Sequence, residues 1–135
     1  MRRAAVLGAL LLTAAPSLLQ AQAGREEFRE AARTCRYAPA AEQRTCMAFE
    51  LCKAKRDPSA CEQRYYVTME RRDVVNAACT GKQGTVLRNC MREEYKTLGD
   101  APRLEACTGL LGTELRECVH EEYRKLPPPR PSRRG

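Results

Sequence analysis

Residues 79–98 read CTGKQGTVLRNCMREEYKTL, and residues 107–126 read CTGLLGTELRECVHEEYRKL. The two copies share a Cys-Thr-Gly-x-x-Gly-Thr opening, a second cysteine eleven positions after the first, and a Glu-Glu-Tyr triplet near the end. Glycine often ends one helix, and a threonine hydroxyl often caps the next. The tandem repeat therefore predicts a turn followed by a helix, twice. In this prediction Gly81 ends a helix, and Thr85 and Thr113 each cap the helix that follows.

Apolar residues at helical spacing extend outward from the repeat. Their spacing predicts helices over residues 24–36, 40–55, about 59–79, 85–98, about 102–108 and 113–126. Ser59 and Glu62 form a capping-box pattern, so Ser59 is expected to cap the third helix. The helix over 40–55 carries apolar residues round much of its circumference, which predicts a central position.

No segment alternates between polar and apolar residues as a β-strand does. The expected fold class is therefore all-α, a small disulfide-stapled bundle of consecutive helical hairpins. Residues 24–126 would form this cysteine-rich domain, and residues 127–135 a disordered, basic, proline-rich tail.

The first residues have the organisation of an export signal. A basic start is followed by an apolar run over residues 4–15, and Ala21 and Ala23 supply the small residues expected before a cleavage site. We expect residues 1–23 to be the signal peptide. No later stretch is apolar enough to cross a membrane, so the sequence predicts a periplasmic or secreted protein without a transmembrane segment after cleavage.

The formal net charge of +7 is concentrated at the two ends of the chain. Arg2 and Arg3 would leave with the signal, which lowers the charge by two to +5, and the tail holds three more arginines, so residues 24–126 carry only +2. So small an excess is not typical of a nucleic-acid-binding domain. The tail has no aromatic residue for base stacking, and no specific nucleic-acid partner is expected.

Eight cysteines in a short exported chain predict a disulfide framework. Eight cysteines allow on the order of a hundred pairings, but residues at equal distances from the turn of a helical hairpin face each other. The expected bonds are Cys35–Cys46, Cys52–Cys61, Cys79–Cys90 and Cys107–Cys118. A rival arrangement joins Cys90 to Cys107 and leaves Cys79 to pair with Cys118. It breaks the symmetry of the two copies, but the sequence leaves it open.

Residue spacing also argues against metal, redox and phosphate chemistry. Eight or ten residues separate the expected cysteine partners, whereas zinc sites usually use cysteines about two to four residues apart. No C-x-x-C pair of the kind that exchanges thiols occurs. The glycine turns lack the spacing and the preceding strand of a phosphate-binding loop. We therefore expect no metal and no cofactor.

Candidate functional side chains are few. His120 is the only histidine and stands where the other copy has Arg92, so we interpret it as a solvated surface residue and assign no catalytic residue. One possible contact face consists of the repeated acidic-aromatic triplets, Glu93, Glu94, Tyr95, Glu121, Glu122 and Tyr123. In the alternative interpretation, the two tyrosines close the edge of the core and the glutamates are solvated.

The Cys-x10-Cys spacing, the G-x-x-G-T-x-L-R-x-C pattern and the D-P-x-x-C at Asp57 to Cys61 resemble those of small exported Cys-pair helical-hairpin proteins of Gram-negative bacteria. The resemblance covers residues 35–126, and its motifs specify turns and bridges rather than chemistry. Residues 111–116 are also faintly similar to the PsiF repeat of phosphate-starvation periplasmic proteins. The cysteines of that family are more widely spaced, so no function or residue is carried over from it.

Together these features predict a non-enzymatic exported protein with a binding or structural role in the cell envelope, whose partner is an unknown protein or envelope component. The alternative is a thiol-active or metal-handling periplasmic protein. A count of free thiols in the purified protein would distinguish the two.

Overall fold

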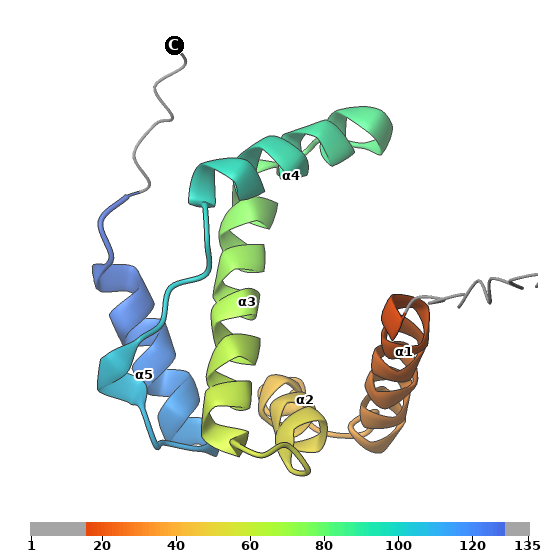
Figure 1. Ribbon diagram of the computed structural model, residues 1–135. Coiled ribbons are helices and arrows are strands. Elements are labelled where there is room, and N and C mark those ends of the chain that lie inside the picture. The colour runs from red at the N-terminus through yellow and green to blue at the C-terminus, as the bar shows by residue number, and fades with distance from the viewer. Residues whose placement is uncertain (1–15, 129–135) are drawn as a thin grey trace, which may run out of the picture.

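The structure is a computed structural model that describes residues 16–128, with side chains from residue 20 onward. Within this range the chain is all-α, without a strand (Figure 1). Its elements are α1 (Pro16–Thr34), α2 (Gln43–Cys52), α3 (Pro58–Ala78), α4 (Gly84–Leu98), the 3₁₀ turn η1 (Glu105–Cys107) and α5 (Gly112–Lys125). Residues 1–15 of the expected signal and 129–135 of the expected tail lie outside this range.

Four disulfide bonds staple the bundle, and each spans a turn between successive segments. They join Cys35 to Cys46, Cys52 to Cys61, Cys79 to Cys90 and Cys107 to Cys118. No described cysteine is free. Such a framework is typical of proteins that fold in an oxidising, extracytoplasmic compartment.

The longest described helix, α3, is the axis of the fold. It contacts α2, α4 and α5, and Figure 1 shows α2 and α4 at its opposite ends. The main core cluster forms where α2, α3, α5 and the segment before α5 meet; its buried members are Ala48, Tyr66, Val67, Leu104, Cys107, Leu115 and Val119. The central position that the sequence predicted for residues 40–55 agrees with the contacts of α2, which packs against α1, α3 and α5 and contributes Ala48 to the core cluster. Its wide apolar arc also carries two disulfide cysteines and an exposed Phe49.

The two copies of the repeat have the same local structure but different packing. Each copy has two glycines at positive φ, Gly81 and Gly84 in the first and Gly109 and Gly112 in the second, and this backbone conformation favours glycine. In α5, Leu115 and Val119 are completely buried, whereas α4 has no buried residue. Since α4 packs against the end of α3 and α5 packs against both α2 and α3, only the second copy contributes to the main core cluster.

Three of the predicted caps are wrong. Asp57 caps α3, with its carboxylate accepting a hydrogen bond from the Ala60 N–H at 3.0 Å, because Pro58 fits the first helical position and moves the cap ahead of Ser59. The helices α4 and α5 begin at glycine, one residue before Thr85 and Thr113, and neither has a side-chain cap.

The helix predicted over 102–108 is present only as η1. Pro102 lies in an irregular stretch between Gly99 and Leu104. The side chain of Gln63 explains why this stretch does not form a helix. Its amide accepts the Leu104 N–H at 3.1 Å and donates to the Leu104 carbonyl at 3.0 Å. These two bonds hold Leu104 extended.

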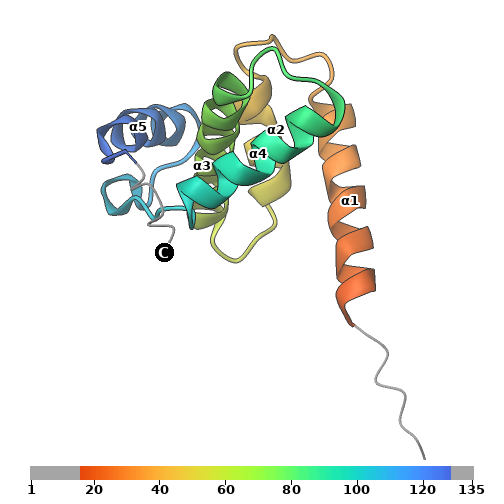
Figure 2. The same cartoon turned by 90° about the horizontal axis from the view of Figure 1, so that it is seen from above.

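The first helix lies at the edge of the molecule, beside α2 (Figure 2). It buries Ala31 and is joined to α2 through Cys35. The helix begins at Pro16, so cleavage after Ala23 would remove its first turns and leave the part that contacts α2. No helix in the described part of the chain combines the length and the apolar character needed to span a membrane.

Candidate functional site

The strongest candidate site is an apolar groove of about 700 Å³ between α2 and the beginning of α5. Two large apolar side chains line it from different elements: Phe49 of α2, which is 54% exposed, and Leu111, which is 51% exposed. Cys46 and Pro58 extend the apolar lining. We call this surface the α2–α5 groove. Exposed hydrophobic side chains that gather in one hollow are a better candidate for a docking surface than scattered ones, which need no explanation.

The sequence builds this groove at the position where the two copies of the repeat differ most. The first turn has Lys82 and Gln83 between its glycines, and the second has Leu110 and Leu111. Leu110 packs against the core, while Leu111 points outward into the groove. Consecutive leucines in a turn are a signal that sequence reasoning could have used, because a turn that only connects helices is usually polar.

Polar side chains of α3 hold the leucine turn in place. Ser59 donates its hydroxyl to the Leu110 carbonyl at 2.8 Å and accepts the Gly109 N–H at 3.1 Å. Glu62, which is almost completely buried, accepts the Gly112 N–H at 2.8 Å. The two residues of the predicted capping box therefore act on a distant turn, and they fix the position of Leu111.

A further buried polar group belongs to Tyr66 of the core cluster. The Tyr66 hydroxyl is buried beside Thr45 and makes no hydrogen bond of regular geometry. Burial raises the pKa of the Tyr66 phenol above its ordinary value, so this group stays neutral at physiological pH. A buried hydroxyl without a good partner is uncommon, and its neighbour Thr45 is one of the residues that line the groove.

Two of the three charged groups that line the groove, Lys53 and Glu62, already have partners inside the chain. Lys53 donates to Glu50 one turn away on the same side of α2, and the Glu62 carboxylate is held by the Gly112 N–H. Glu42 stands exposed at the rim. The arrangement can therefore accept an apolar group without leaving a buried charge unpaired, which would be costly.

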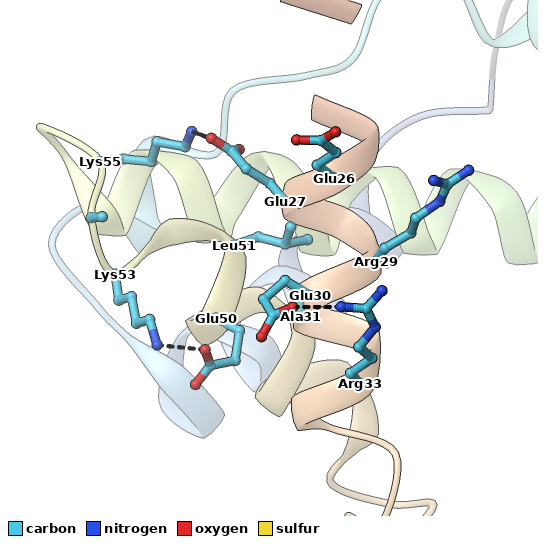
Figure 3. A pocket seen from close by; sticks show the side chains of 11 residues that line it. Glu26, Glu27, Arg29, Glu30, Ala31, Arg33, Glu50, Leu51, Lys53 and Lys55 are labelled. Atoms are coloured by element: carbon cyan, nitrogen blue, oxygen red, sulfur yellow. Dashed lines mark hydrogen bonds and ion pairs between the residues drawn. The ribbon is translucent and has the colours of Figure 1, made fainter. Parts of the chain in front are cut away.

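A second hollow, of about 600 Å³, lies between α1 and α2 and is lined mainly by charged side chains (Figure 3). Six of its eight charged side chains form three pairs: Lys55 donates to Glu27 across the hollow, Lys53 pairs with Glu50, and Arg33 pairs with Glu30. These pairs are exposed, and exposed pairs contribute little stability each. We interpret this hollow as the seam that joins α1 to the bundle.

The only histidine lies in a third hollow, of about 400 Å³, between α2, α3 and α5. His120 is exposed, as the sequence predicted, and its Nδ1 lies 2.9 Å from a Glu70 carboxylate oxygen. In the same hollow, Arg44 makes two hydrogen bonds to Asp73, at 2.7 and 2.8 Å. These bonds hold the pKa of Asp73 below its ordinary value. The contacts link neighbouring helices and need no ligand to explain them.

The acidic-aromatic triplets lie on separate helices that both pack against α3. Tyr123 packs against the core cluster, and Tyr95 is half-buried on α4. Glu93 pairs with Lys96, and Glu122 pairs with Lys125, each within one helix. This arrangement agrees with the interpretation of Tyr123 as an edge of the core, whereas Tyr95 lies outside the core cluster. A contact role for the triplets remains a prediction.

All eight cysteines lie in disulfides, and within residues 20–128 no group of three or more His, Cys, Asp or Glu side chains is arranged to hold a metal ion. No protein-family model matches the chain, and neither a curated protein nor a solved structure matches it.

Proposed function

We propose that this protein is an exported, non-enzymatic binding protein whose α2–α5 groove holds an apolar side chain of a protein partner. The observation that carries this proposal is the exposure of Phe49 and Leu111 together in one hollow, on elements fixed by disulfides and by the Ser59 and Glu62 hydrogen bonds. A rigid apolar pocket with a polar rim has the form of an interface hot spot.

Proposed export rests on the sequence of residues 1–23 and on the disulfide framework. We propose cleavage after Ala23 and a periplasmic or secreted mature protein. The resemblance to small exported Cys-pair helical-hairpin proteins of Gram-negative bacteria supports the same compartment. Mass spectrometry of the protein recovered from an expression host that exports it would give the first mature residue, which we expect to be Gly24.

A peptide selection on the mature, oxidised protein tests the binding proposal. A displayed random-peptide library would be selected against immobilised residues 24–135, and the affinities of the enriched peptides measured for wild type and variants. We expect the enriched peptides to share an apolar residue. Leu111→Gln and Phe49→Gln should each weaken their binding by about tenfold, the effect of losing roughly 1.4 kcal/mol of contact.

The repeat supplies matched variants for this experiment. Leu111→Gln introduces the residue that the first copy has at the same place, Gln83, so the turn tolerates it. Val86→Glu removes another exposed apolar side chain, from α4 outside the groove, and introduces the residue of the second copy, Glu114. Unchanged affinity in Leu111→Gln and Phe49→Gln, or an equal loss in Val86→Glu, would contradict a binding role for the groove.

A further inference from the structure

We propose that the Cys79–Cys90 bond is a site of thiol–disulfide exchange, opened by dithiols before the other three bonds, and that its reduction releases α4 from the bundle. This inference is independent of the groove. It rests on two features of the corner between α3 and α4: a lysine beside the disulfide and the absence of buried residues in α4.

The lysine distinguishes this bond from the other three. The Lys82 ammonium donates to Cys90 Sγ at 3.2 Å, and within the described residues it is the only cation that donates a hydrogen bond to a cysteine sulfur. A neighbouring ammonium group attracts an incoming thiolate and stabilises a cysteine thiolate when one is released. The equivalent residue of the other copy is Leu110, which packs against the core instead.

Burial alone does not separate the four bonds. Each bond joins one buried cysteine to one half-buried cysteine; the buried members are Cys35, Cys52, Cys79 and Cys107. The half-buried Cys90 Sγ is therefore the sulfur that a dithiol can reach, and it is the one beside Lys82. The charge, rather than access, selects this bond.

The exchange would proceed in two steps. A thiolate of the dithiol attacks Cys90 Sγ, the Sγ–Sγ bond breaks, and its electron pair leaves on Cys79 Sγ, which takes a proton from water. The second thiolate of the dithiol then attacks its own partner sulfur in the mixed disulfide and releases Cys90 as a thiolate beside the Lys82 ammonium. The Cys90 thiolate then takes a proton from water, so that the dithiol has lost two electrons and become a disulfide while the two cysteines have become thiols.

Opening of the disulfide bond should have different consequences in the two copies of the repeat. α4 has no buried residue and packs against α3. Just after the end of α4, the Gly99 carbonyl accepts a hydrogen bond of 2.6 Å from the Arg71 guanidinium of α3. α5 buries Leu115 and Val119 and contacts α2 as well as α3. Elements with few buried contacts open most readily, so α4 should detach while α5 stays in place.

Partial reduction with dithiothreitol tests the proposal. The oxidised mature protein would be reduced for increasing times under native conditions, blocked with N-ethylmaleimide, and mapped by peptide mass spectrometry for each cysteine. We expect Cys79 and Cys90 to be labelled before the other six cysteines. Hydrogen exchange on the same partly reduced sample should show lost protection in α4 and retained protection in α5.

Three variants test the role of the lysine. Lys82→Leu, which introduces the residue of the other copy, should slow reduction of this bond by about threefold or more, because the cation is removed. Lys82→Arg should keep the wild-type rate, and Lys96→Leu, on the outer part of α4, should not change it. Equal reduction of all four bonds, earlier reduction of another bond, or an unchanged rate in Lys82→Leu would overturn the proposal.

Discussion

Tyr66 shows how one side chain can be well packed and poorly hydrogen-bonded at the same time. Its ring is part of the core cluster and contacts Tyr65 edge to face, while its hydroxyl is buried beside Thr45 without a regular hydrogen bond. An unsatisfied buried hydroxyl costs free energy that the ring packing must offset. The local pattern of apolar residues could not reveal this.

Removal of this hydroxyl is not expected to lower the free energy of unfolding, unlike most substitutions in a core. Tyr66→Phe should leave the free energy of unfolding unchanged or raise it by up to about 1 kcal/mol, because it removes a buried polar group that lacks a good partner. Urea unfolding followed by circular dichroism would measure this. A loss of about 1 kcal/mol or more would mean that the hydroxyl makes a stabilising bond.

Asp73 gives a pH-dependent prediction. Its two bonds from Arg44 lower its pKa from an ordinary 3.8, and a lowered carboxyl pKa stabilises the fold at pH values above the ordinary pKa and loses this effect as pH falls through the folded value. Because both partners are more than a third exposed, Asp73→Asn should cost less than about 1 kcal/mol at pH 7.

The pH dependence of the effect of Asp73→Asn provides the control. The difference in unfolding free energy between wild type and Asp73→Asn should shrink as the pH is lowered from 7 to below 3.8, because the wild-type carboxyl then becomes neutral as well. A difference that stays constant over this range would show that the carboxylate charge does not stabilise the fold.

At the scale of elements, the two copies show that one sequence pattern can have two structural roles. Leu87 and Leu115 occupy the same position of the repeat. Leu87 is half-buried on α4, while Leu115 is fully buried between α5 and the core. Helical spacing identified the apolar face of both helices, but it carries no information about how much neighbouring structure covers that face.

A matched pair of truncations measures this difference. Leu115→Ala should destabilise the protein by about 3 kcal/mol, in the range found for fully buried leucines, and Leu87→Ala by about 1 kcal/mol or less, as for partly exposed positions. Both positions lie at the same place in their helices, so the change in helix propensity from leucine to alanine is the same in the two variants and does not affect the comparison. Equal losses in urea unfolding would mean that α4 is packed as firmly as α5.

Capping was the least predictable feature of the elements. Ser59 and Glu62 have the spacing of a local cap, yet both bind the turn of the second copy, fifty or more residues away in the sequence. Asp57, which does cap α3, was available two residues earlier. Short polar side chains suit both tasks, and only the tertiary structure decides between them.

At the scale of the whole molecule, the all-α class followed from periodicity and from the absence of alternating segments, and the structure confirms it. The arrangement of the helices did not follow, because it depends on contacts such as that of α5 with α2, which are far apart in the sequence. The groove was also missed, since it forms between Phe49 and Leu111, on two such distant segments.

The disulfides dominate the stability of this small bundle. Three of the four bonds close loops with a sequence separation of 11 and the fourth one of 9, and each should contribute about 3 kcal/mol in the chain-entropy account. Four such contributions are as large as the whole net stability of a typical domain, about 5–15 kcal/mol. Only a few large apolar side chains are fully buried, so the core alone should not suffice.

Thermal unfolding of the oxidised protein and of the fully reduced, alkylated protein, followed by far-ultraviolet circular dichroism, tests this central claim most directly. We predict a cooperative transition for the oxidised protein, and for the reduced protein either no cooperative transition or a Tm lower by at least about 20 °C. A reduced chain that unfolds cooperatively at the same temperature as the oxidised one would contradict the claim that bonds across the turns hold this chain folded.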